Sequence, residues 1–411
     1  MNPSVRPSAQ AGVIVAAQDG HADSNISPAV PKFNLTVPQS TPVGACWNGQ
    51  EVQVDIIVDR SIGKALNFNL QFDVNFTNST GSAGTAYVAS SASFVTRIDQ
   101  LYNGNVIETI YAPNLLYEGI AFNTDLTIQQ QASTWGIDVS QANHVAPATI
   151  SVPSAGLNQT FYLPLSGVFA NAQLFVAGLR GELRFRVYLA PQALCNANGY
   201  VSTSGVGISL RAMNLWTEEA SLSPEAYNSL MEQHRSGINY RSVLRTVWSR
   251  TQPQLTAGNT QTDILNAFSN DSAALLVWLN SASTDPGYFL NRYPISTLQL
   301  LDAGGATLTR VLPASLVENR ISPSQTPIGS NFINSTTFTS YIFPWSSSLD
   351  RVLNGGKVLG GLKLSAAEQI VINPAQSVQG AAETVVSFDY AALRVANGEL
   401  SWCKSAGDCP A

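Results

Sequence analysis

Residues 94–111 read FVTRIDQLYNGNVIETIY, and this stretch decides the class of fold. Apolar and polar side chains alternate on both sides of Asn103-Gly104, as they do in half-buried strands. An Asn-Gly pair tolerates the positive φ angles of a type I′ turn. The stretch therefore predicts a β-hairpin whose strands are residues 94–101 and 105–111.

The same two-residue period recurs through the first half of the chain. Residues 66–76 (LNFNLQFDVNF) place six apolar side chains on one face of a strand. Further strands are predicted at residues 50–58, 159–165, 181–189 and 208–216. Residues 112–134, which begin Ala-Pro, are expected to form one or two short helices within a long insertion.

A helix is predicted at the middle of the chain. Ser223 can cap it, Pro224 suits its first position, Glu225 suits the positive end of its dipole, and Gly237 ends it. Strand patterns resume beyond it, at residues 243–248, 273–279, 295–301, 307–312, 338–344, 369–373 and 385–395. The simplest interpretation is a helix that joins two β-domains.

The two halves of the sequence also echo each other. Residues 98–110 (IDQLYNGNVIETI) match residues 298–311 (LQLLDAGGATLTRV), since each reads as strand, glycine-containing turn and strand. Two further segments recur in the same order: FYLPLSGVF (161–169) with YIFPWSSSL (341–349), and GLRGELRFRVYL (178–189) with GGLKLSAAEQIVI (360–372). The common order favours duplication of one β-sandwich.

Four features carry a resemblance to a known family: this hairpin, the LPLSGVF and GLRGELRFRVYL segments, the Ser-Pro-capped helix and the weaker echo after it. In these features the chain resembles the double jelly-roll major capsid proteins of tailless icosahedral DNA viruses, the adenovirus, tectivirus and polinton-like lineage. The resemblance implies an all-β fold of two tandem eight-stranded jelly-roll sandwiches. It implies that three chains form a pseudo-hexagonal capsomer, and that capsomers tile an icosahedral shell. The implied partners are further copies of the chain, minor capsid and penton proteins and, in many relatives, an internal viral membrane.

These features give a hypothesis for the domain limits. We expect a flexible N-terminal arm at residues 1–32, a first jelly roll at 33–220, a linking helix at 221–240, a second jelly roll at 241–398 and a C-terminal tail at 399–411. The sequence has neither the pattern of a secretion signal nor an apolar run long enough for a membrane span. A protein made in soluble form inside the host cell and then built into the virion is expected.

Composition argues against a role in binding the genome. Charged residues are 12% of the chain and the net charge is −6. Residues 1–32 hold Arg6 and Lys32 against Asp19 and Asp23, so they lack the basic tail that neutralises nucleic-acid phosphates. No sequence-specific binding of nucleic acid is expected. A weakly charged surface suits contact with other copies, because buried charges cost desolvation.

No catalytic, cofactor-binding or metal-binding residue is predicted. His21, His144 and His234 lack metal-ligand spacing, so each is interpreted as a structural histidine. Glycosidase chemistry would need a carboxylate pair, for which the candidates are Glu108, Glu118 and Glu182. Against this role, Glu108 is expected to point outward from its hairpin, and Glu182 to form an ion pair with the nearby Arg184.

Two features remain open. The arginines of residues 235–250 are interpreted as a stripe between domains or subunits in preference to a nucleic-acid patch. Cys46 and Cys195 are expected to be buried free thiols, as are Cys403 and Cys409, with a disulfide between the last two as the alternative. A carbohydrate-binding β-sandwich protein is the alternative function, although it would need a secretion route and a platform of clustered aromatic residues.

Overall fold

The computed structural model describes most of the chain. The described residues are 32–38, 44, 46–122, 136–138, 146–197, 199–220, 222–283, 285–286, 292–317, 321, 341–346, 349, 353 and 360–403. Within these ranges the chain is mostly antiparallel β-structure with short helices. No helix in the described part combines the length and the apolar character that crossing a bilayer would require.

The first sandwich consists of two four-stranded sheets. One has the order β1 (Lys32–Thr36), β13 (Val206–Ala220), β3 (Lys64–Asn78) and β9 (Leu157–Leu165), and the other β2 (Val52–Ile57), β10 (Leu183–Leu189), β5 (Val95–Tyr102) and β6 (Asn105–Tyr111). The alternation in β3 turns Phe68, Leu70 and Phe72 inward, where all are fully buried. Smaller elements lie beside them: β4 (Gly84–Val88), β7 (Ile137–Asp138), β8 (Ala146–Val152), β11 (Asn196–Ala197), β12 (Tyr200–Val201), η1 (Ser91–Phe94), η2 (Val176–Gly178), α2 (Ala112–Phe122) and α4 (Val168–Ala172).

The predicted hairpin is confirmed. β5 pairs with β6, and Tyr102 faces Asn105 across the turn. Asn103 has a φ of 49° and Gly104 a φ of 80°, so both turn residues are in the left-handed region that a type I′ turn requires.

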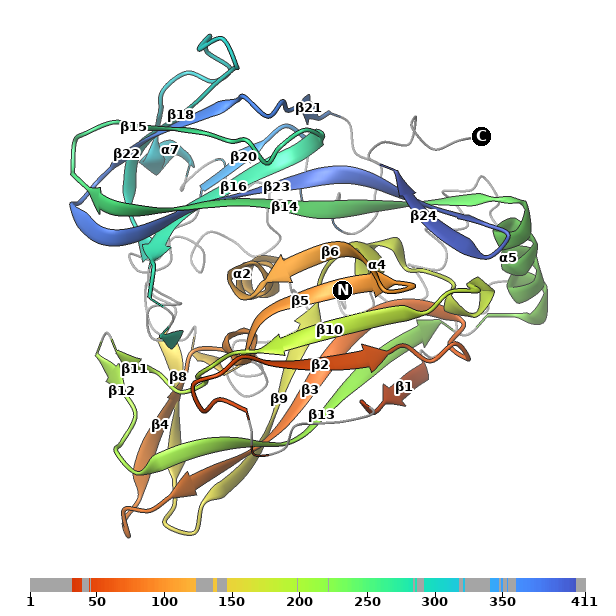
Figure 1. The fold of residues 1–411 in the computed structure, drawn as a ribbon, viewed down its shortest axis with the longest axis horizontal. Helices are drawn as coiled ribbons and strands as arrows, with labels where there is room; N and C mark the ends of the chain where they lie inside the picture. The colour runs from red at the N-terminus through yellow and green to blue at the C-terminus, as the bar shows by residue number, and fades with distance from the viewer. Residues whose placement is uncertain are drawn as a thin grey trace, which may run out of the picture.

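The linking helix is α5 (Pro224–Ser236), which joins β13 to β14 (Ile238–Leu255). The Ser223 hydroxyl accepts a hydrogen bond from the Ala226 amide at 3.2 Å, and Gly237 follows the last turn with a φ of 118°. The start and end signals in the sequence are therefore confirmed. Figure 1 shows α5 at one end of the molecule, where the chain passes from the first sandwich to the second.

The second sandwich repeats the strand order of the first. Its larger sheet has the order β14, β23 (Val378–Ala396), β16 (Asp271–Ser281), with β20 (Tyr341–Pro344) next to β16. Its other sheet has the order β15 (Gln261–Ile264), β22 (Gln369–Pro374), β18 (Ile295–Leu301) and β19 (Leu312–Pro313). The larger sheet also includes β17 (Arg292–Tyr293), β21 (Leu362–Lys363) and β24 (Glu399–Cys403), and α7 (Ala314–Leu316) follows β19.

The echoed sequence segments occupy matching places in the two sandwiches. Asn103-Gly104 joins β5 and β6, the third and fourth strands of the sheet β2-β10-β5-β6 in the first sandwich. Gly304-Gly305 lies in the turn after β18, which is the third strand of the matching sheet. Pro164 lies in β9, which pairs with β3, and Pro344 lies in β20, which pairs with β16, the strand that matches β3. The echoed segments therefore hold the same places in the strand order of the two sandwiches.

Other element limits differ from the sequence-based ones. Residues 307–312 were expected to form a strand, but they contribute a single bridge at Thr307 and the first residue of β19. The strand β14 begins at Ile238, directly after the helix end at Gly237, so the last three residues of the range 221–240 belong to this strand. The first residues of the predicted tail form β24, which pairs with β23.

Candidate functional site: the seam between the two sandwiches

The two sandwiches meet at a continuous surface, here called the seam. It is formed by β6, α2 and α4 of the first sandwich and by β14, β16 and β23 of the second (Figure 1). Side chains alternate along β16: Leu276 and Trp278 join the core of the first sandwich, whereas Leu275 and Val277 join the second sandwich's own core. This sheet is therefore buried on both faces, which explains its near-continuous apolar sequence.

An aromatic stack fixes α2 against the sheet. The ring of Tyr117 stacks on Trp278 with centroids 6.4 Å apart and an interplanar angle of 22°. The guanidinium of Arg292 lies 4.3 Å from the centroid of the Trp278 ring, where burial lowers the pKa of Arg292 to about 9. Large rigid rings in one stack oppose sliding of one sandwich over the other.

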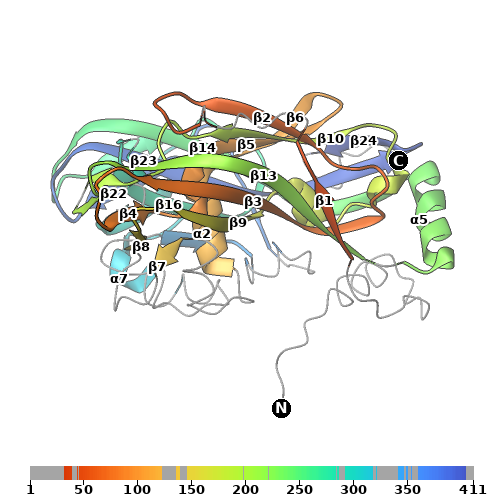
Figure 2. The same cartoon turned by 90° about the horizontal axis from the view of Figure 1, so that it is seen from below.

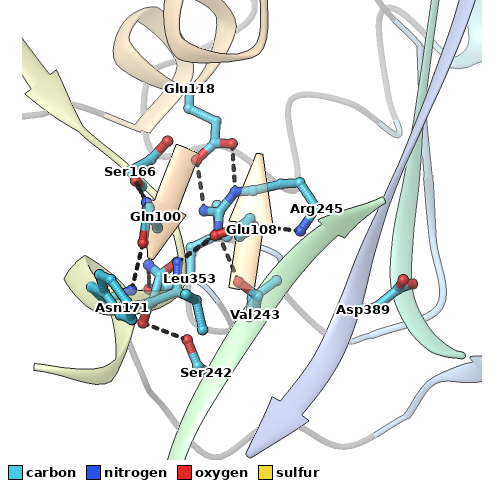
Figure 3. A network of polar contacts seen from close by, with 12 residues as sticks. Gln100, Glu108, Glu118, Ser166, Asn171, Ser242, Val243, Arg245, Leu353 and Asp389 are labelled. Atoms are coloured by element: carbon cyan, nitrogen blue, oxygen red, sulfur yellow. Dashed lines mark hydrogen bonds and ion pairs between the residues drawn. The ribbon is translucent and has the colours of Figure 1, made fainter. Parts of the chain in front are cut away.

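The charged centre of the seam is Arg245 of β14 (Figure 3). Its guanidinium donates to both oxygens of Glu118 at 2.8 Å, and it also donates to the Asn171 side-chain oxygen and to the Val243 carbonyl, both at 2.8 Å. The Arg245 side chain has no solvent exposure. Burial alone would lower the pKa of Arg245, but the carboxylates of Glu118 and Glu108 raise it above its ordinary value, so the guanidinium stays charged.

Glu108 completes the network from β6. One of its oxygens accepts from the Val168 amide at 2.6 Å, and the other accepts from the Arg245 amide at 2.6 Å. The expectation that Glu108 points outward is wrong: it shares the inward face with Ile110, two residues away, and is buried. Burial raises the pKa of Glu108, and this effect outweighs the nearby positive charge of Arg245, which lowers the pKa.

Hydrogen bonds between α4 and neighbouring parts of the chain close the other side of the seam. The Ser242 hydroxyl donates to the Val168 carbonyl at 2.8 Å, and the Asn171 amide donates to the Leu353 carbonyl at 2.6 Å. Gly167, which precedes α4, has a φ of 115°, and a Cβ there would lie 1.9 Å from the Gln100 side-chain nitrogen. Only glycine fits this approach without strain.

The chemistry of these carboxylates is structural. Those of Glu108 and Glu118 are buried, and both accept hydrogen bonds from donors of the protein. Glu182 instead lies at the other side of the first sandwich, where Arg184 binds it at 2.6 Å as expected, and Arg184 also binds Asp55 at 2.8 Å. The structure therefore brings Glu108 and Glu118 together around an arginine and leaves Glu182 apart.

His234 is buried and hydrogen-bonded. Its Nε2 lies 2.6 Å from the Tyr240 hydroxyl, and its ring packs edge-on against Phe175. Burial lowers the pKa of His234 to about 4. His21 and His144 lie outside the described residues, and in the described part no group of three or more His, Cys, Asp or Glu side chains could hold a metal ion.

The arginines of residues 235–250 have separate partners. Arg245 lies in the seam, which agrees with the predicted stripe between domains, while Arg235 pairs with Glu232 on α5 and Arg250 pairs with Asp263. Cys46 and Cys195 are both buried, as expected, and burial raises the pKa of Cys46 to about 11. Cys409 lies outside the described residues, and with it the question of its pairing with Cys403.

A second buried acidic pair lies inside the second sandwich. Asp263 of β15 accepts hydrogen bonds from Gln252 and Gln261, both at 3.0 Å, in addition to its ion pair with Arg250. Glu383 of β23 is fully buried nearby. Burial, together with the negative charge of Asp263, raises the pKa of Glu383 to about 8, so this carboxyl is protonated at neutral pH.

Comparison with known proteins identifies the fold. No family model and no curated protein sequence matches the chain. Solved structures match it over nearly its whole length. PBCV-1 VP54, fitted into a reconstruction of the virophage Sputnik, has a TM-score of 0.67 at 14% identity and covers 93% of this chain and 99% of its own. The Faustovirus major capsid protein has a TM-score of 0.62 at 9% identity over 94% and 97%.

A third match is the mavirus major capsid protein, with a TM-score of 0.52 at 11% identity over 94% of each chain. These structures are double jelly rolls. The chain therefore has the double jelly-roll fold, two tandem sandwiches joined by a helix, and the fold expected from the sequence is confirmed.

Proposed function

We propose that this double jelly-roll chain is the major capsid protein of an icosahedral virus and that three copies form a pseudo-hexagonal capsomer. One observation carries the proposal: the similarity to viral major capsid proteins extends through both sandwiches and the helix between them, and covers 94–97% of the matched capsid proteins. The shared feature is thus the complete two-roll unit, and not one sandwich that many unrelated proteins could contain.

The seam supports this proposal physically. Two sandwiches with the same strand order present similar edges, so three chains offer six similar bodies to a hexagonal lattice site. Such a unit works only if the two sandwiches of one chain keep a fixed relation. The buried Arg245 and the stack of Tyr117 on Trp278 provide that fixed relation.

The proposal extends to partners and location. We propose that the protein resides in the virion shell, with neighbouring capsomers and minor capsid or penton proteins as partners, in some viruses over an internal membrane. The proposed role is structural, without catalysis, cofactor or sequence-specific binding of nucleic acid. We propose that the two jelly rolls, expected at residues 33–220 and 241–398, extend to Lys32 in β1, to Ile238 in β14 and to Cys403 in β24, and that residues 1–31 are an arm that orders on assembly.

The oligomeric state of the purified chain tests the proposal. Multi-angle light scattering at neutral pH and micromolar concentration should give about 131 kDa, three times the 43.8 kDa of one chain. Deleting residues 1–31 should leave this mass unchanged and impair the assembly of shells. A chain that stays at 43.8 kDa over the whole concentration range would contradict the capsid role.

A further inference from the structure

The turn between β23 and β24 reaches beyond the sandwich to which it belongs. Both views of the fold place β24 at the same end of the molecule as the linking helix α5 (Figures 1 and 2). Asn397 has a φ of 52° and Gly398 a φ of 77°, so both turn residues are in the left-handed region, as in a two-residue hairpin turn. The hairpin is part of the larger sheet of the second sandwich, but its turn makes backbone hydrogen bonds to α5 and to the first sandwich.

The first of these contacts caps the C-terminal end of α5. The last carbonyls of a helix have no partner within the helix and need donors from elsewhere. The Gly398 amide donates to the His234 carbonyl at 3.1 Å, and the Asn397 amide donates to the Arg235 carbonyl at 3.2 Å. The end of the linking helix is therefore held by a turn that comes from the second sandwich.

The second contact joins the same turn to the first sandwich. The Arg180 amide donates to the Gly398 carbonyl at 2.8 Å, and the Tyr102 hydroxyl lies 3.1 Å from the Glu399 carboxylate. A Cβ at Gly398 would lie 2.8 Å from the Arg180 side chain and 3.1 Å from the Gly178 carbonyl oxygen, so only glycine combines this approach with a positive φ. We call this arrangement the latch, made by residues 397–399 and the groups that bind them on His234, Arg235, Arg180 and Tyr102.

The side chain of His234 contacts all three parts of the chain that the latch joins. It extends from α5, and its Nε2 lies 2.6 Å from the hydroxyl of Tyr240 on β14. Its ring packs edge-on against Phe175, which precedes η2, and a Cβ at Gly178 would lie 2.4 Å from its Nδ1. The residue is only 1% exposed, so little water is present to stabilise a positive charge on the ring.

No carboxylate in the described part of the chain forms an ion pair with His234. The charged side chains on the elements packed around it are Glu232 and Arg235 on α5, Arg180 after η2, Arg241 on β14, and Arg394 and Glu399 on the β23–β24 hairpin. Glu232 pairs with Arg235 at 3.6 Å, and Glu399 binds Tyr102. Both carboxylates thus have other partners, and a protonated His234 gains no compensating ion pair.

We propose that the latch opens as a unit while both sandwich cores stay folded, and that protonation of His234 drives this opening in acid. Histidine is the side chain best suited to such a switch, and parts of a protein can open locally without global unfolding. An open latch leaves the end of α5 without its caps and frees β24 from the first sandwich. The relation between the two sandwiches then depends on the seam and on α5 itself. Every contact of the latch lies within one chain, so the device does not depend on the proposed capsid function.

The direction and size of the effect follow from the two states of His234. Burial lowers the pKa of His234 to about 4 in the closed latch, although a hydrogen bond to the Gly178 backbone favours the protonated form. In the open latch the ring is in water and has its ordinary pKa of 6.5. Protons therefore bind the open form preferentially below pH 6.5. The two pKa values predict a rise in the opening equilibrium constant of about thirtyfold from pH 8 to pH 5, with a limit of about 300-fold below pH 4.

Hydrogen exchange of the full chain, read by mass spectrometry, tests the latch. The protection factors of the Arg180 and Gly398 amides, resolved from overlapping peptides and corrected for the pH dependence of chemical exchange, are compared at pH 8 and pH 5. Both should fall about thirtyfold at pH 5, whereas those of β3 and β13 should stay constant. His234→Gln keeps a side chain that can hydrogen-bond to Tyr240 but does not titrate, so its protection factors should be equal at the two pH values.

Two glycine variants give a second test that needs no change at His234. Gly398→Ala places a methyl group where there is no room, so the latch should be open at both pH values and its protection low and nearly independent of pH. Gly104→Ala is the matched control, since Gly104 also has a positive φ in a hairpin turn but nothing lies within 4 Å of the added Cβ. It should behave as the wild type does. Glu399→Gln removes the carboxylate at the turn and should keep the fall in protection at pH 5.

Several results would overturn the inference. One is equal protection of the Arg180 and Gly398 amides at pH 8 and pH 5 in the wild type. Another is an equal loss of protection throughout both sandwiches, which would mean global unfolding in place of a latch. A fall that persists in His234→Gln and disappears in Glu399→Gln would place the titration on Glu399. Protection in Gly398→Ala that matches Gly104→Ala at both pH values would show that the turn is not held as described.

Discussion

Replacing Arg245 with methionine should destabilise the chain strongly, because Arg245 forms a buried ion pair with Glu118 in the seam. Methionine has a similar length and is apolar, so the change removes the charge while leaving little empty space. It leaves the Glu118 carboxylate, which is 6% exposed, without its two hydrogen bonds of 2.8 Å.

The expected magnitude follows from that burial. Removing one partner of a buried ion pair costs roughly 3–5 kcal/mol, because the other charge remains buried without compensation. The Arg245 side chain is fully buried, and two neutral acceptors, the Asn171 side chain and the Val243 carbonyl, lose a donor as well. We therefore expect a loss of about 4 kcal/mol in the free energy of unfolding.

Two comparisons identify the cause. Adding Glu118→Met to Arg245→Met removes the uncompensated charge, so the double variant should regain at least about 2 kcal/mol. Arg184→Met removes an arginine with two carboxylate partners on the outer face, where its side chain is 27% exposed, and should cost less than about 1 kcal/mol. Urea unfolding followed by circular dichroism measures all of these variants.

The result that would refute this reasoning is equally specific. If Arg245→Met were as stable as Arg184→Met, or if adding Glu118→Met made it worse, the ion pair would not hold the seam. The two sandwiches would then be held together by apolar packing alone, and the fixed relation between them would need another explanation.

Three further predictions concern other buried groups. The folded-state pKa of Glu383, about 8, lies above its ordinary value of 4.5, so its contribution to stability is complete below pH 4.5 and is lost as the pH rises to 8. Glu383→Gln should therefore raise the free energy of unfolding at pH 9 by up to about 4 kcal/mol relative to the wild type, and change it little at pH 4. Urea unfolding measures both values, and equal effects at the two pH values would contradict this. The folded-state pKa of His234, about 4, lies below its ordinary value of 6.5, so its contribution to stability is complete above pH 6.5 and is lost as the pH drops to 4. His234→Gln should therefore reduce the change in the free energy of unfolding between pH 6.5 and pH 4. An unchanged slope over this range would show that another group titrates. Gly167→Ala should lower the thermal unfolding midpoint by several degrees more than Gly104→Ala, since both glycines have positive φ but only the first is crowded, by Gln100; similar shifts in calorimetry would count against the packing described before α4.

Much of the fold could be predicted because its signals are local. The Asn103-Gly104 turn and the Ser223-Pro224 helix start depend on neighbouring residues, and both are where the sequence placed them. The duplication was also visible, since strands with the same role kept similar sequences around Pro164 and Pro344. The region after β18 was predicted poorly, because residues 307–312 alternate like a strand but have few partners to pair with.

The arginines of residues 235–250 suggested a contact between domains, but the acidic partners of Arg245 could not be predicted, because they meet it only in three dimensions. Arg245 is 137 residues from Glu108 and 127 residues from Glu118 in the sequence, and a charged residue in a strand usually faces solvent. One signal was available: Glu108 shares the parity of Ile110, so the two-residue period already turned it toward the core side. An ionisable residue on the apolar face of a strand is a reason to expect a buried partner from another domain.

Electron microscopy of the purified chain tests the central claim most directly. Class averages viewed along the symmetry axis should show particles with a hexagonal outline and threefold symmetry, in which six similar bodies of density surround the centre. Each adjacent pair of bodies should fit one copy of the chain with the seam intact. Single two-lobed particles, or assemblies in which the two sandwiches of a chain lie apart, would contradict the account.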